Sequence, residues 1–422
     1  MTPASPGSLR HHRREFSRRR LFAGAAALLA APLLALRSAT AAVPALRITG
    51  VELIPVRATS RTVWVFVRLR TDRGLTGLGE ASDAFGFANT TRADVDTMRA
   101  QVASFVRMIE GRSPLDITAF RQQGLPLART GLVAATAFSA IEQALWDLTG
   151  KALGVPVHAL LGGKLRAALP VYANINRATT MRTPSGFAAT ARRAVADGFR
   201  AIKAAPFDGF PPADSPAAQI EKAIEDGIAA VVAMREAVGS GVAVMVDCHS
   251  FFNVEQAVRI AGRLERQSLT WYEEPVAPEN VDATLQIKRR ITQPMAAGEL
   301  LFGIGGFAPL VRQHAVNVIM PDVKHCGGLL ELTHIAAEAA SEGLLVAPHN
   351  PSGPVSTAAS LQACVSLPNV NYLELQYGEV AWRADVVAPP ERFVDGQARV
   401  ADRPGFGIEL NDALIKTRAL PL

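Results

Sequence analysis

Five polar segments at nearly even spacing in the second half of the chain constrain its fold most strongly. Each ends an apolar, strand-like run, and the residues that close them, 23 to 27 positions apart, are Asp247, Glu273, Glu299, Asp322 and His349. A strand, its return helix and two loops take about that many residues, since eight such units make a barrel of roughly 250 residues. The spacing therefore places these side chains at the C-terminal ends of successive (β/α)8 barrel strands, where such barrels carry their active sites.

The segment between residues 169 and 375 supports the same architecture. Short β-type runs alternate there with helical stretches, which indicates parallel strands joined by right-handed crossovers. The predicted strands are Leu169–Ile175, Arg200–Ala204, Ala243–Asp247, Thr270–Glu274, Met295–Glu299, Asn317–Met320, Leu344–Ala347 and Asn371–Leu375. Eight strands favour a closed barrel over an open sheet.

A different pattern precedes the barrel. Two alternating β-type runs, Ile48–Val56 and Val63–Arg70, are followed by amphipathic stretches at Asp94–Glu110 and Ala134–Leu153. Strands followed by helices indicate a separate α+β unit. The Pro-rich stretch from about residue 387 to the C-terminus lacks periodicity, and we expect it to fold back onto this first unit.

The composition is that of an ordinary globular protein, with 422 residues of which 49% are hydrophobic and 19% charged. The net charge of +6 comes from the N-terminus, because residues 1–41 contain seven Arg and one Glu and leave 37 basic and 37 acidic residues elsewhere. A neutral body gives no electrostatic reason to expect nucleic acid or a membrane as partner. Three widely spaced cysteines without a CxxC pair argue against a disulfide framework or a zinc site.

Residues 1–41 have the three parts of an export signal. A basic stretch contains the twin arginines of Ser17–Phe22, an Ala/Leu-rich run follows over 21–36, and the small residues Ala39–Ala41 resemble a cleavage site. The twin arginines are similar to a Tat signal, which exports folded proteins, so we expect a periplasmic protein. The alternative, a membrane anchor, is disfavoured because the apolar run is shorter than the roughly 20 residues that a span needs.

Asp247, Glu273 and Glu299 are the predicted metal ligands. Carboxylates that meet at one rim repel one another unless a cation lies between them. Oxygen ligands favour Mg²⁺ over Zn²⁺, and few protein ligands leave positions for substrate oxygens. Glu274 competes with Glu273 for the role. Strand alternation sends the two to opposite faces, and we choose Glu273 because it shares a face with Trp271.

Two histidines are candidates for proton transfer. His349 ends the seventh predicted strand and Asp322 the sixth, so they are neighbours at the rim. A carboxylate bonded to an imidazole suits a general base, although a structural Asp–His pair is the alternative. His249 lies two residues after Asp247, where period-2 geometry points both inward. It could bind metal, donate a proton, or face solvent from a loop.

Three further residues are predicted to bind substrate. Lys203 ends the second strand, where a lysine in a barrel mouth could bind an anion. Glu374, near the end of the eighth strand, could hydrogen-bond substrate oxygens or close the barrel. His325 lies in the loop after the sixth strand and either shapes that loop or contacts substrate.

Taken together, these motifs resemble the enolase superfamily, mandelate racemase subgroup. The resemblance is carried by residues 140–163, with the runs AIEQALWDLTGK and LLGG, and by the strand ends Asp247, Glu273-Glu274-Pro275, Gly298-Glu299, Pro321-Asp322 and Pro348-His349. It implies an α/β fold, a modified (β/α)8 TIM barrel with an N-terminal α+β capping domain. It also carries the family's Mg²⁺ ligands over to Asp247, Glu273 and Glu299, and its His–Asp dyad to His349 and Asp322.

The resemblance implies a division of the chain as well. Behind a signal peptide at 1–41 we expect a capping domain at 45–165, a barrel at 166–385 and a tail at 386–422 that packs on the capping domain. A homo-oligomer is also implied. Substrate specificity is expected from capping-domain loops, above all Glu80–Thr91, with Phe85 and Phe87 as lid residues.

Two details select a reaction within that subgroup. The racemases of this subgroup resemble one another in having a Lys-x-Lys pair on the second strand, and the second lysine of the pair is a base. In this chain the two positions are Lys203 and Ala205, so that base is missing. The run Asp247-Cys248-His249 is similar to the Asp-x-His of acid-sugar dehydratases, in which the histidine is a general acid. The resemblance implies a Mg²⁺-dependent lyase that converts a sugar acid, an aldonate or aldarate with a galactonate-like substrate favoured, to a 2-keto-3-deoxy acid.

Two alternatives stay open. An acid-sugar racemase or epimerase would use His249 on the second face of the substrate. A non-catalytic periplasmic sugar-acid binder would keep the site without turnover, although a binder has no need of a base.

Overall fold

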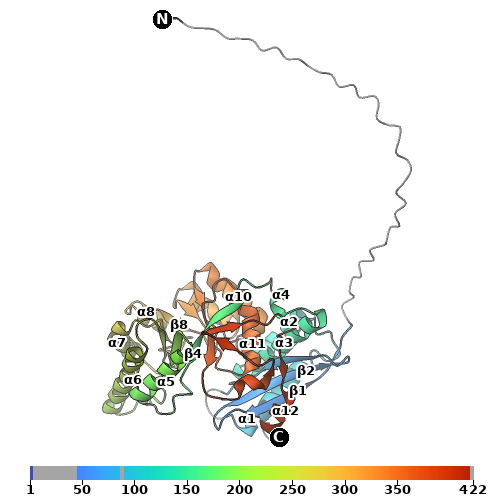
Figure 1. The fold of residues 1–422 in the computed structure, drawn as a ribbon, viewed down its shortest axis with the longest axis horizontal. Coiled ribbons are helices and arrows are strands. Elements are labelled where there is room, and N and C mark those ends of the chain that lie inside the picture. The colour runs from blue at the N-terminus through green and yellow to red at the C-terminus, as the bar shows by residue number, and fades with distance from the viewer. Residues whose placement is uncertain (3–44, 86–89, 419–422) are drawn as a thin grey trace, which may run out of the picture. The chain divides into compact units, whose positions relative to one another are not determined.

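The computed structural model describes residues 1–2, 45–85 and 90–418. Residues 3–41 of the predicted export signal, and Phe87 of the predicted lid, lie outside these described residues. Val43–Leu422 forms one compact unit, which contains every helix and strand named below (Figure 1). Among the described residues there is no helix with the length and apolarity that a membrane crossing requires.

Three antiparallel strands begin the fold, in the order β1 (Ile48–Arg57), β2 (Val63–Thr71) and β3 (Thr76–Glu80). Helices α1 (Arg92–Val106), α2 (Ile117–Ala128), α3 (Leu132–Leu153) and the short α4 (Val157–Leu160) follow. Helix α3 packs directly against β3, because a Cβ built on Gly79 would lie 2.0 Å from the carbonyl oxygen of Ala140. The predicted strands and the helices α1 and α3 are present.

The sequence pattern does not predict α2. This helix contains Gly124 and Pro126, and both residue types lower intrinsic helix propensity. Its Phe120 is buried and stacks on Phe138 of α3, with ring centroids 4.9 Å apart. Tertiary packing thus outweighs a poor local propensity here.

Eight parallel strands then form the barrel. They are β4 (Ala168–Asn174), β5 (Ala201–Ala204), β6 (Ala243–Asp247), β7 (Trp271–Glu273), β8 (Met295–Ala297), β9 (Val318–Ile319), β10 (Leu345–Val346) and β11 (Leu373–Gln376). β4 to β10 pair in chain order and β11 pairs with β4, while a bridge between Val346 and Val370 joins β10 to the segment that enters β11. The ring is therefore closed, and all eight predicted strands are present.

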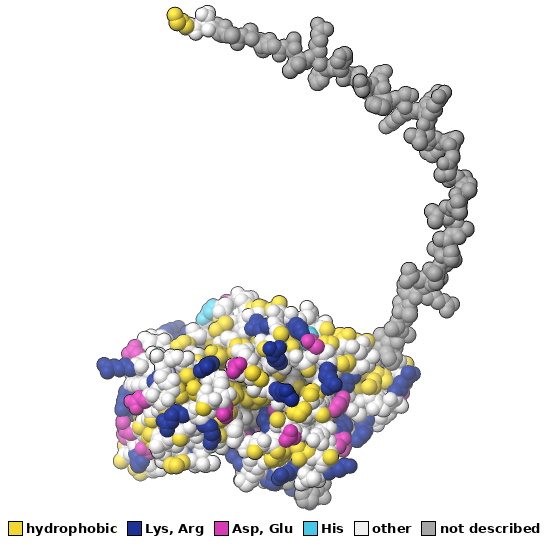
Figure 2. Space-filling model, in the orientation of Figure 1, with side chains coloured by type: hydrophobic (Ala, Val, Ile, Leu, Met, Phe, Trp, Pro, Cys, Tyr) yellow, Lys and Arg dark blue, Asp and Glu magenta, His cyan; other side chains and the backbone are white. Residues whose placement is uncertain are grey.

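Helices connect these strands and cover the barrel. They are α5 (Pro184–Ala196), α6 (Ala217–Val238), α7 (Val254–Arg263) with the 3-10 turn η1 (Glu265–Gln267), α8 (Val281–Lys288), α9 (Gly303–Arg312), α10 (Gly328–Ser341) and α11 (Pro354–Cys364). Helix α7 illustrates the local logic: Asn253 and Gln256 form a reciprocal cap at its start, and Ala257, Ile260 and Ala261 form its buried face. Charges of both signs are interspersed on the face in Figure 2, as expected for a neutral body.

The tail contains η2 (Arg383–Val386), β12 (Val387–Ala388), β13 (Phe393–Val394), β14 (Gln397–Arg399), β15 (Glu409–Leu410) and α12 (Asp412–Arg418). Its Val387, Leu410 and Ile415 share a core cluster with Val56 and Trp64 of the first sheet, which is the contact the sequence predicts for this segment. In addition, β14 pairs antiparallel with β4 of the barrel.

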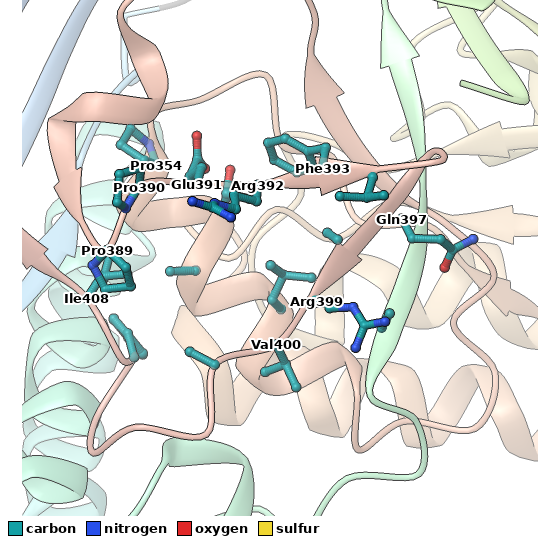
Figure 3. Close-up of a pocket in the computed structure, with 18 of the residues that line it drawn as sticks. Pro354, Pro389, Pro390, Glu391, Arg392, Phe393, Gln397, Arg399, Val400 and Ile408 are labelled. Atoms are coloured by element: carbon teal, nitrogen blue, oxygen red, sulfur yellow. The ribbon is translucent and has the colours of Figure 1, made fainter. Parts of the chain in front are cut away.

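The tail and α11 line a cavity of about 770 Å³ (Figure 3). Pro354, Leu361, Pro389, Phe393, Val400 and Ile408 contribute to its wall. Ala168, at the start of β4, also lines it, so the cavity lies at the end of the barrel opposite the C-terminal rim. None of the predicted site residues lines this cavity.

Candidate active site

Asp247, Glu273 and Glu299 meet at the C-terminal rim of the barrel. Each offers a carboxylate oxygen, and the three oxygens lie within 4.8 Å of one another. Parallel pairing sets Asp247 of β6 opposite Glu273 of β7, and Glu299 follows the end of β8. All three side chains are buried. Strands that end in step thus bring together the carboxylates that the spacing predicts.

The surroundings of these carboxylates fit a divalent cation. Oε2 of Glu299 is buried and accepts no hydrogen bond from the described residues. Burial, followed by the charges of Glu274 and Asp247, raises the pKa of Glu299 well above its ordinary value. Burial also raises the pKa of Glu273 to about 8 although Lys203 opposes the shift. A cation that replaces lost water and neutralises like charges would remove both penalties.

Glu273, rather than Glu274, is the third member of this trio. The indole Nε1 of Trp271 donates to Oε2 of Glu273 over 2.7 Å, as a shared face predicts. The carboxylate of Glu274 instead accepts from the backbone N–H groups of Gly298, at 2.7 Å, and Glu299, at 3.3 Å. The side chain of Glu274 therefore binds the backbone just after β8, the next strand of the barrel.

His349 and Asp322 form a buried dyad beside the trio. Nδ1 of His349 lies 2.8 Å from Oδ2 of Asp322, and its Nε2 lies 3.3 Å from Oε2 of Glu299. Burial would raise the pKa of Asp322, but Lys324 and His325, followed by His349, hold it below its ordinary value. An ionised Asp322 favours the tautomer of His349 with its proton on Nδ1, which leaves Nε2 able to accept a proton near the trio.

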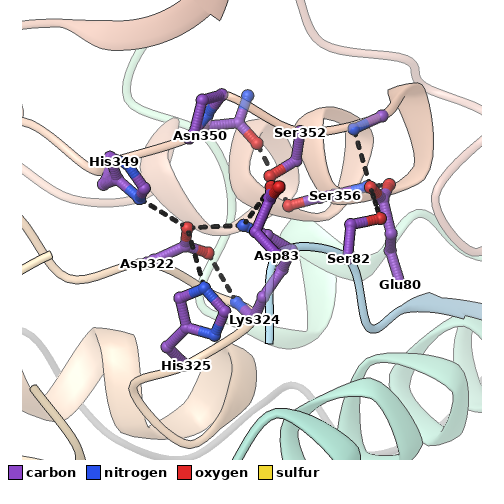
Figure 4. Close-up of polar contacts among 12 residues, drawn as sticks. Glu80, Ser82, Asp83, Asp322, Lys324, His325, His349, Asn350, Ser352 and Ser356 are labelled. Atoms are coloured by element: carbon purple, nitrogen blue, oxygen red, sulfur yellow. Dashed lines mark hydrogen bonds and ion pairs between the residues drawn. The ribbon is translucent and has the colours of Figure 1, made fainter. Parts of the chain in front are cut away.

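Lys324 extends this dyad, and the sequence analysis does not identify it. Its buried Nζ lies 2.7 Å from Oδ2 of Asp322 and 3.7 Å from Oδ2 of Asp83, which follows β3 in the predicted specificity loop (Figure 4). Asp83 also lies 3.6 Å from Arg177. The available signal is local: the carboxylate of Asp322 accepts from the backbone N–H of Lys324 over 2.8 Å, and this turn brings the lysine back to the same carboxylate.

The predicted substrate-binding residues lie close to these groups and are fully enclosed. Nζ of Lys203 lies 2.6 Å from Glu273, 3.2 Å from Glu374 and 3.8 Å from Asp247. The lysine therefore sits beneath the trio within ion pairs rather than in an open mouth. His325 is buried, with Nδ1 2.9 Å from the hydroxyl of Thr136, and burial and Lys324 lower its pKa to about 3. Substrate contacts by these residues stay a prediction.

His249 links the buried trio to solvent. Its Nε2 lies 3.2 Å from Oδ2 of Asp247, and its Nδ1 lies 2.5 Å from Oδ1 of Asp208. Burial opposes its charge, but Asp247 and Asp208 raise the pKa of His249 to about 12, so the ring carries a proton. Its side chain is 15% exposed, against 5% for Asp247.

Comparison with known proteins agrees with this geometry. Residues 40–162 match the N-terminal domain of mandelate racemase/muconate lactonizing enzymes, and residues 186–414 match the enolase C-terminal domain-like family. A solved mandelate racemase/muconate lactonizing enzyme from Jannaschia sp. CCS1 superposes with a TM-score of 0.78 at 28% identity, covering 89% of this chain and 98% of that one.

Curated relatives agree as well. The chain is 32% identical to D-xylonate dehydratase of Haloferax volcanii, covering 82% of this chain and 83% of the relative. It is 33% identical to D-gluconate dehydratase of Thermoproteus tenax, covering 85% of this chain and 70% of the relative. It is 30% identical to D-galactonate dehydratase of Variovorax paradoxus, covering 83% of this chain and 90% of the relative. Dehydratases are hydro-lyases, and the chain is accordingly an enzyme of that class. It belongs to the enolase superfamily and, within it, to the mandelate racemase/muconate lactonizing enzyme family, as its motifs predict.

Proposed function

We propose that this enzyme is a Mg²⁺-dependent dehydratase of a sugar acid, which it converts to a 2-keto-3-deoxy acid. The observation that carries the proposal is the placement of two imidazoles against one carboxylate trio. His349 approaches Glu299 from the end of β10, and His249 approaches Asp247 from the end of β6. A base and an acid at separate positions around one anion-stabilising centre suit the removal of a proton and of a neighbouring hydroxyl.

Each residue has a definite task in this reaction. Asp247, Glu273 and Glu299 would hold Mg²⁺, which stabilises the negative charge that develops on a carboxylate when its α-proton leaves. His349 takes that proton at Nε2, and Asp322, bonded to Nδ1, stabilises the imidazolium. His249 gives a proton to the departing 3-hydroxyl. The enol that remains tautomerises to the keto acid.

A screen of aldonic and aldaric acids with Mg²⁺, read out as 2-keto acid formed, tests the proposal. His349→Asn should lower kcat at least about a hundredfold, the scale of general-base catalysis, while the protein still binds Mg²⁺. His334→Asn, an exposed histidine on α10, is the matched control and should keep full activity. Dehydration that persists in His349→Asn removes the dyad from the mechanism, and a screen without any 2-keto acid removes the dehydratase.

Epimerisation is the second candidate, because two imidazoles flank the trio. It predicts solvent deuterium at the α-carbon of recovered substrate without 2-keto acid. Ala205, in place of the second-strand base lysine, argues against it.

We also propose export to the periplasm through the Tat route, on the basis of residues 1–41. Replacing the arginine pair Arg18 and Arg19 with lysines should retain the protein in the cytoplasm in a fractionation experiment. Equal periplasmic amounts of both forms would contradict this route.

A further inference from the structure

The two barrel helices that follow the dyad residues begin without a capping side chain of their own. Helix α11 starts just after the loop of His349, and helix α10 starts just after the loop of Asp322. The N-cap residue is Gly353 for α11 and Gly327 for α10, and glycine has no side chain that could accept from the N–H groups of a first turn. Because both first turns lie in the interior, these N–H groups need another partner.

A carboxylate from the N-terminal domain (residues 40–162) caps α11. Glu80 ends β3 and is fully buried. Its Oε1 accepts from the backbone N–H of Gly353 over 2.6 Å, and its Oε2 accepts from that of Ser356 over 2.9 Å (Figure 4). The hydroxyl of Ser82 also donates to Oε1, over 2.7 Å. Both oxygens of Glu80 therefore bind the start of α11.

The first turn of α11 in turn holds the loop of the base. The hydroxyl of Ser356 donates to Oδ1 of Asn350 over 3.0 Å, and Nδ2 of Asn350 donates to the hydroxyl of Thr357 over 2.8 Å. Asn350 is the residue after His349, whose Nδ1 lies 2.8 Å from Asp322. Since all these side chains are buried and closely packed, a shift of the first turn is transmitted to His349.

A second carboxylate from the N-terminal domain caps α10. Glu142 lies on α3, is fully buried, and accepts from the backbone N–H groups of Leu329, over 2.7 Å, and Leu330, over 3.0 Å. The loop that joins β9 to α10 carries the carboxylate of the dyad, and α3 binds this loop once more. The hydroxyl of Ser139 accepts there from the backbone N–H of Gly327 over 3.1 Å.

Glycines at both helix starts make room for these carboxylates. Gly353 has a φ of −75° and a ψ of 178°, an extended conformation that any residue adopts, so its backbone does not require glycine. A Cβ at this position would lie 2.8 Å from Oε1 of Glu80. A Cβ at Gly328 would lie 2.1 Å from Oε2 of Glu142. The close approach of a carboxylate from the other domain therefore accounts for Gly353.

We propose that Glu80 and Glu142 are positioning residues for the dyad, because they cap α11 and α10 from the N-terminal domain and so fix His349 and Asp322 for proton transfer. The inference rests on the proposed dehydration, in which this dyad removes the α-proton. Both glutamates act through backbone N–H groups of the helices that follow the dyad loops. Their effect should therefore fall on the rate of proton removal rather than on the binding of substrate or Mg²⁺.

Glu80→Gln and Glu142→Gln test the proposal in the full-length enzyme, with the sugar acid that the screen identifies. The amide has the size of the carboxylate but replaces one acceptor oxygen with an NH₂ donor, which then meets a backbone N–H donor. We expect kcat to fall about tenfold to a hundredfold, the scale of a group misplaced by about 1 Å. KM and the affinity for Mg²⁺ should change less than about twofold, since an interaction that serves only the transition state lowers kcat alone.

Asp147→Asn is the matched control. Asp147 is a buried carboxylate of α3 that accepts from the backbone N–H groups of Leu78, over 2.9 Å, and Phe406, over 2.7 Å. Burial raises the pKa of Asp147, as it raises that of Glu80. Since Asp147 also pairs with Lys151, Asp147→Asn should lower the Tm at least as much as Glu80→Gln does. Its partners lie on β3 and in the tail rather than in the dyad loops, so kcat should stay unchanged.

Ser356→Ala is a milder variant that keeps the cap. It removes only the hydroxyl that binds Asn350 and leaves the backbone N–H that binds Glu80. Its kcat should fall about fivefold, the effect of one lost hydrogen bond, with KM unchanged. This variant decides the question where a glutamine variant does not fold, and an unchanged kcat would then contradict the proposal.

Two further results overturn the inference. Folded glutamine variants with the kcat of the wild type would show that the caps do not position the dyad. A kcat that falls together with the Tm in Asp147→Asn as well would reduce the effect of the caps to stability. In both cases an inactive His349→Asn leaves the proposed function intact, whereas turnover that persists in His349→Asn would remove the dyad from the mechanism and the inference with it.

Discussion

Glu299→Gln tests the electrostatic account of the metal centre directly. Glutamine has the shape of a protonated glutamate but cannot ionise, so the variant removes one of three buried negative charges without creating a cavity. Two unit charges at 4.8 Å, the upper limit of the separation within the trio, repel by about 3 kcal/mol at an effective dielectric constant of roughly 20. Metal-free protein should therefore become more stable, and binding of Mg²⁺ should become weaker.

The pH dependence follows from the same charges. Burial raises the pKa of Glu273 from 4.5 to about 8 in metal-free protein, and the pKa of Glu299 is raised as well. A carboxyl with a raised pKa binds its proton more tightly in the folded state, so it stabilises the fold at low pH. That contribution is lost as pH rises from about 4.5 through about 8. The relief in Glu299→Gln should thus be small at pH 6 and larger at pH 9.

Thermal unfolding measures both effects. At about 100 times its dissociation constant, Mg²⁺ adds about 2.7 kcal/mol of stability. With an unfolding entropy of about 2.1 cal/mol/K per residue, the wild-type Tm should rise by about 3 °C, since the compact unit has about 380 residues. Removing about 3 kcal/mol of repulsion should raise the Tm of metal-free Glu299→Gln by about 4 °C at pH 9.

Protein treated with a chelator is compared with and without Mg²⁺ at pH 6 and 9. Glu221→Gln, an exposed glutamate paired with Arg259, is the control and should respond to Mg²⁺ like the wild type. The reasoning is refuted if Glu299→Gln gains as many degrees from Mg²⁺ as the wild type does. It is equally refuted if the metal-free variant unfolds several degrees below the metal-free wild type at pH 9.

Two further substitutions test the surroundings of the centre. Lys324→Met leaves the buried carboxylate of Asp322 without the lysine that it shares with the partly exposed Asp83. The free energy of unfolding should therefore fall by about 3–5 kcal/mol and kcat should drop. Unchanged values of both would contradict the extended dyad. Gly79→Ala places a Cβ 2.0 Å from a backbone oxygen of α3, so the free energy of unfolding measured in urea should fall by at least about 3 kcal/mol. Gly50→Ala is the control: its Cβ meets nothing within 4 Å, and the free energy of unfolding should fall by less than about 1 kcal/mol.

The sequence predicts the barrel and the trio because both depend on short-range regularities. Strand alternation and the length of the βα repeat determine which residue lies at the rim. Parallel pairing then makes residues at the ends of successive strands neighbours in space. The choice of Glu273 over Glu274 shows the strength of this logic, since one residue along a strand reverses the face. The indole Nε1 of Trp271, on the same face, donates a hydrogen bond to the carboxylate of Glu273.

Lys324 escapes sequence reasoning for the opposite reason. Lys324 lies in a loop, and its ion pair depends on Asp83, which belongs to the loop after β3. Contacts between a loop of the N-terminal unit and the barrel rim are properties of docking, which a one-dimensional pattern does not encode.

Lys203 is predicted to bind a substrate carboxylate, and the structure shows it in ion pairs with Glu273 and Glu374. When all three carboxylates are ionised, the trio and this one ammonium carry a net charge of two negative units, which matches the charge of a divalent cation. Nζ of Lys203 lies within ion-pair distance of Glu273 and Glu374. A cation at the trio would weaken that attraction, because Glu273 would then share its charge with the metal. The predicted role of Lys203 toward a substrate carboxylate therefore depends on metal binding, so metal and substrate should bind in that order.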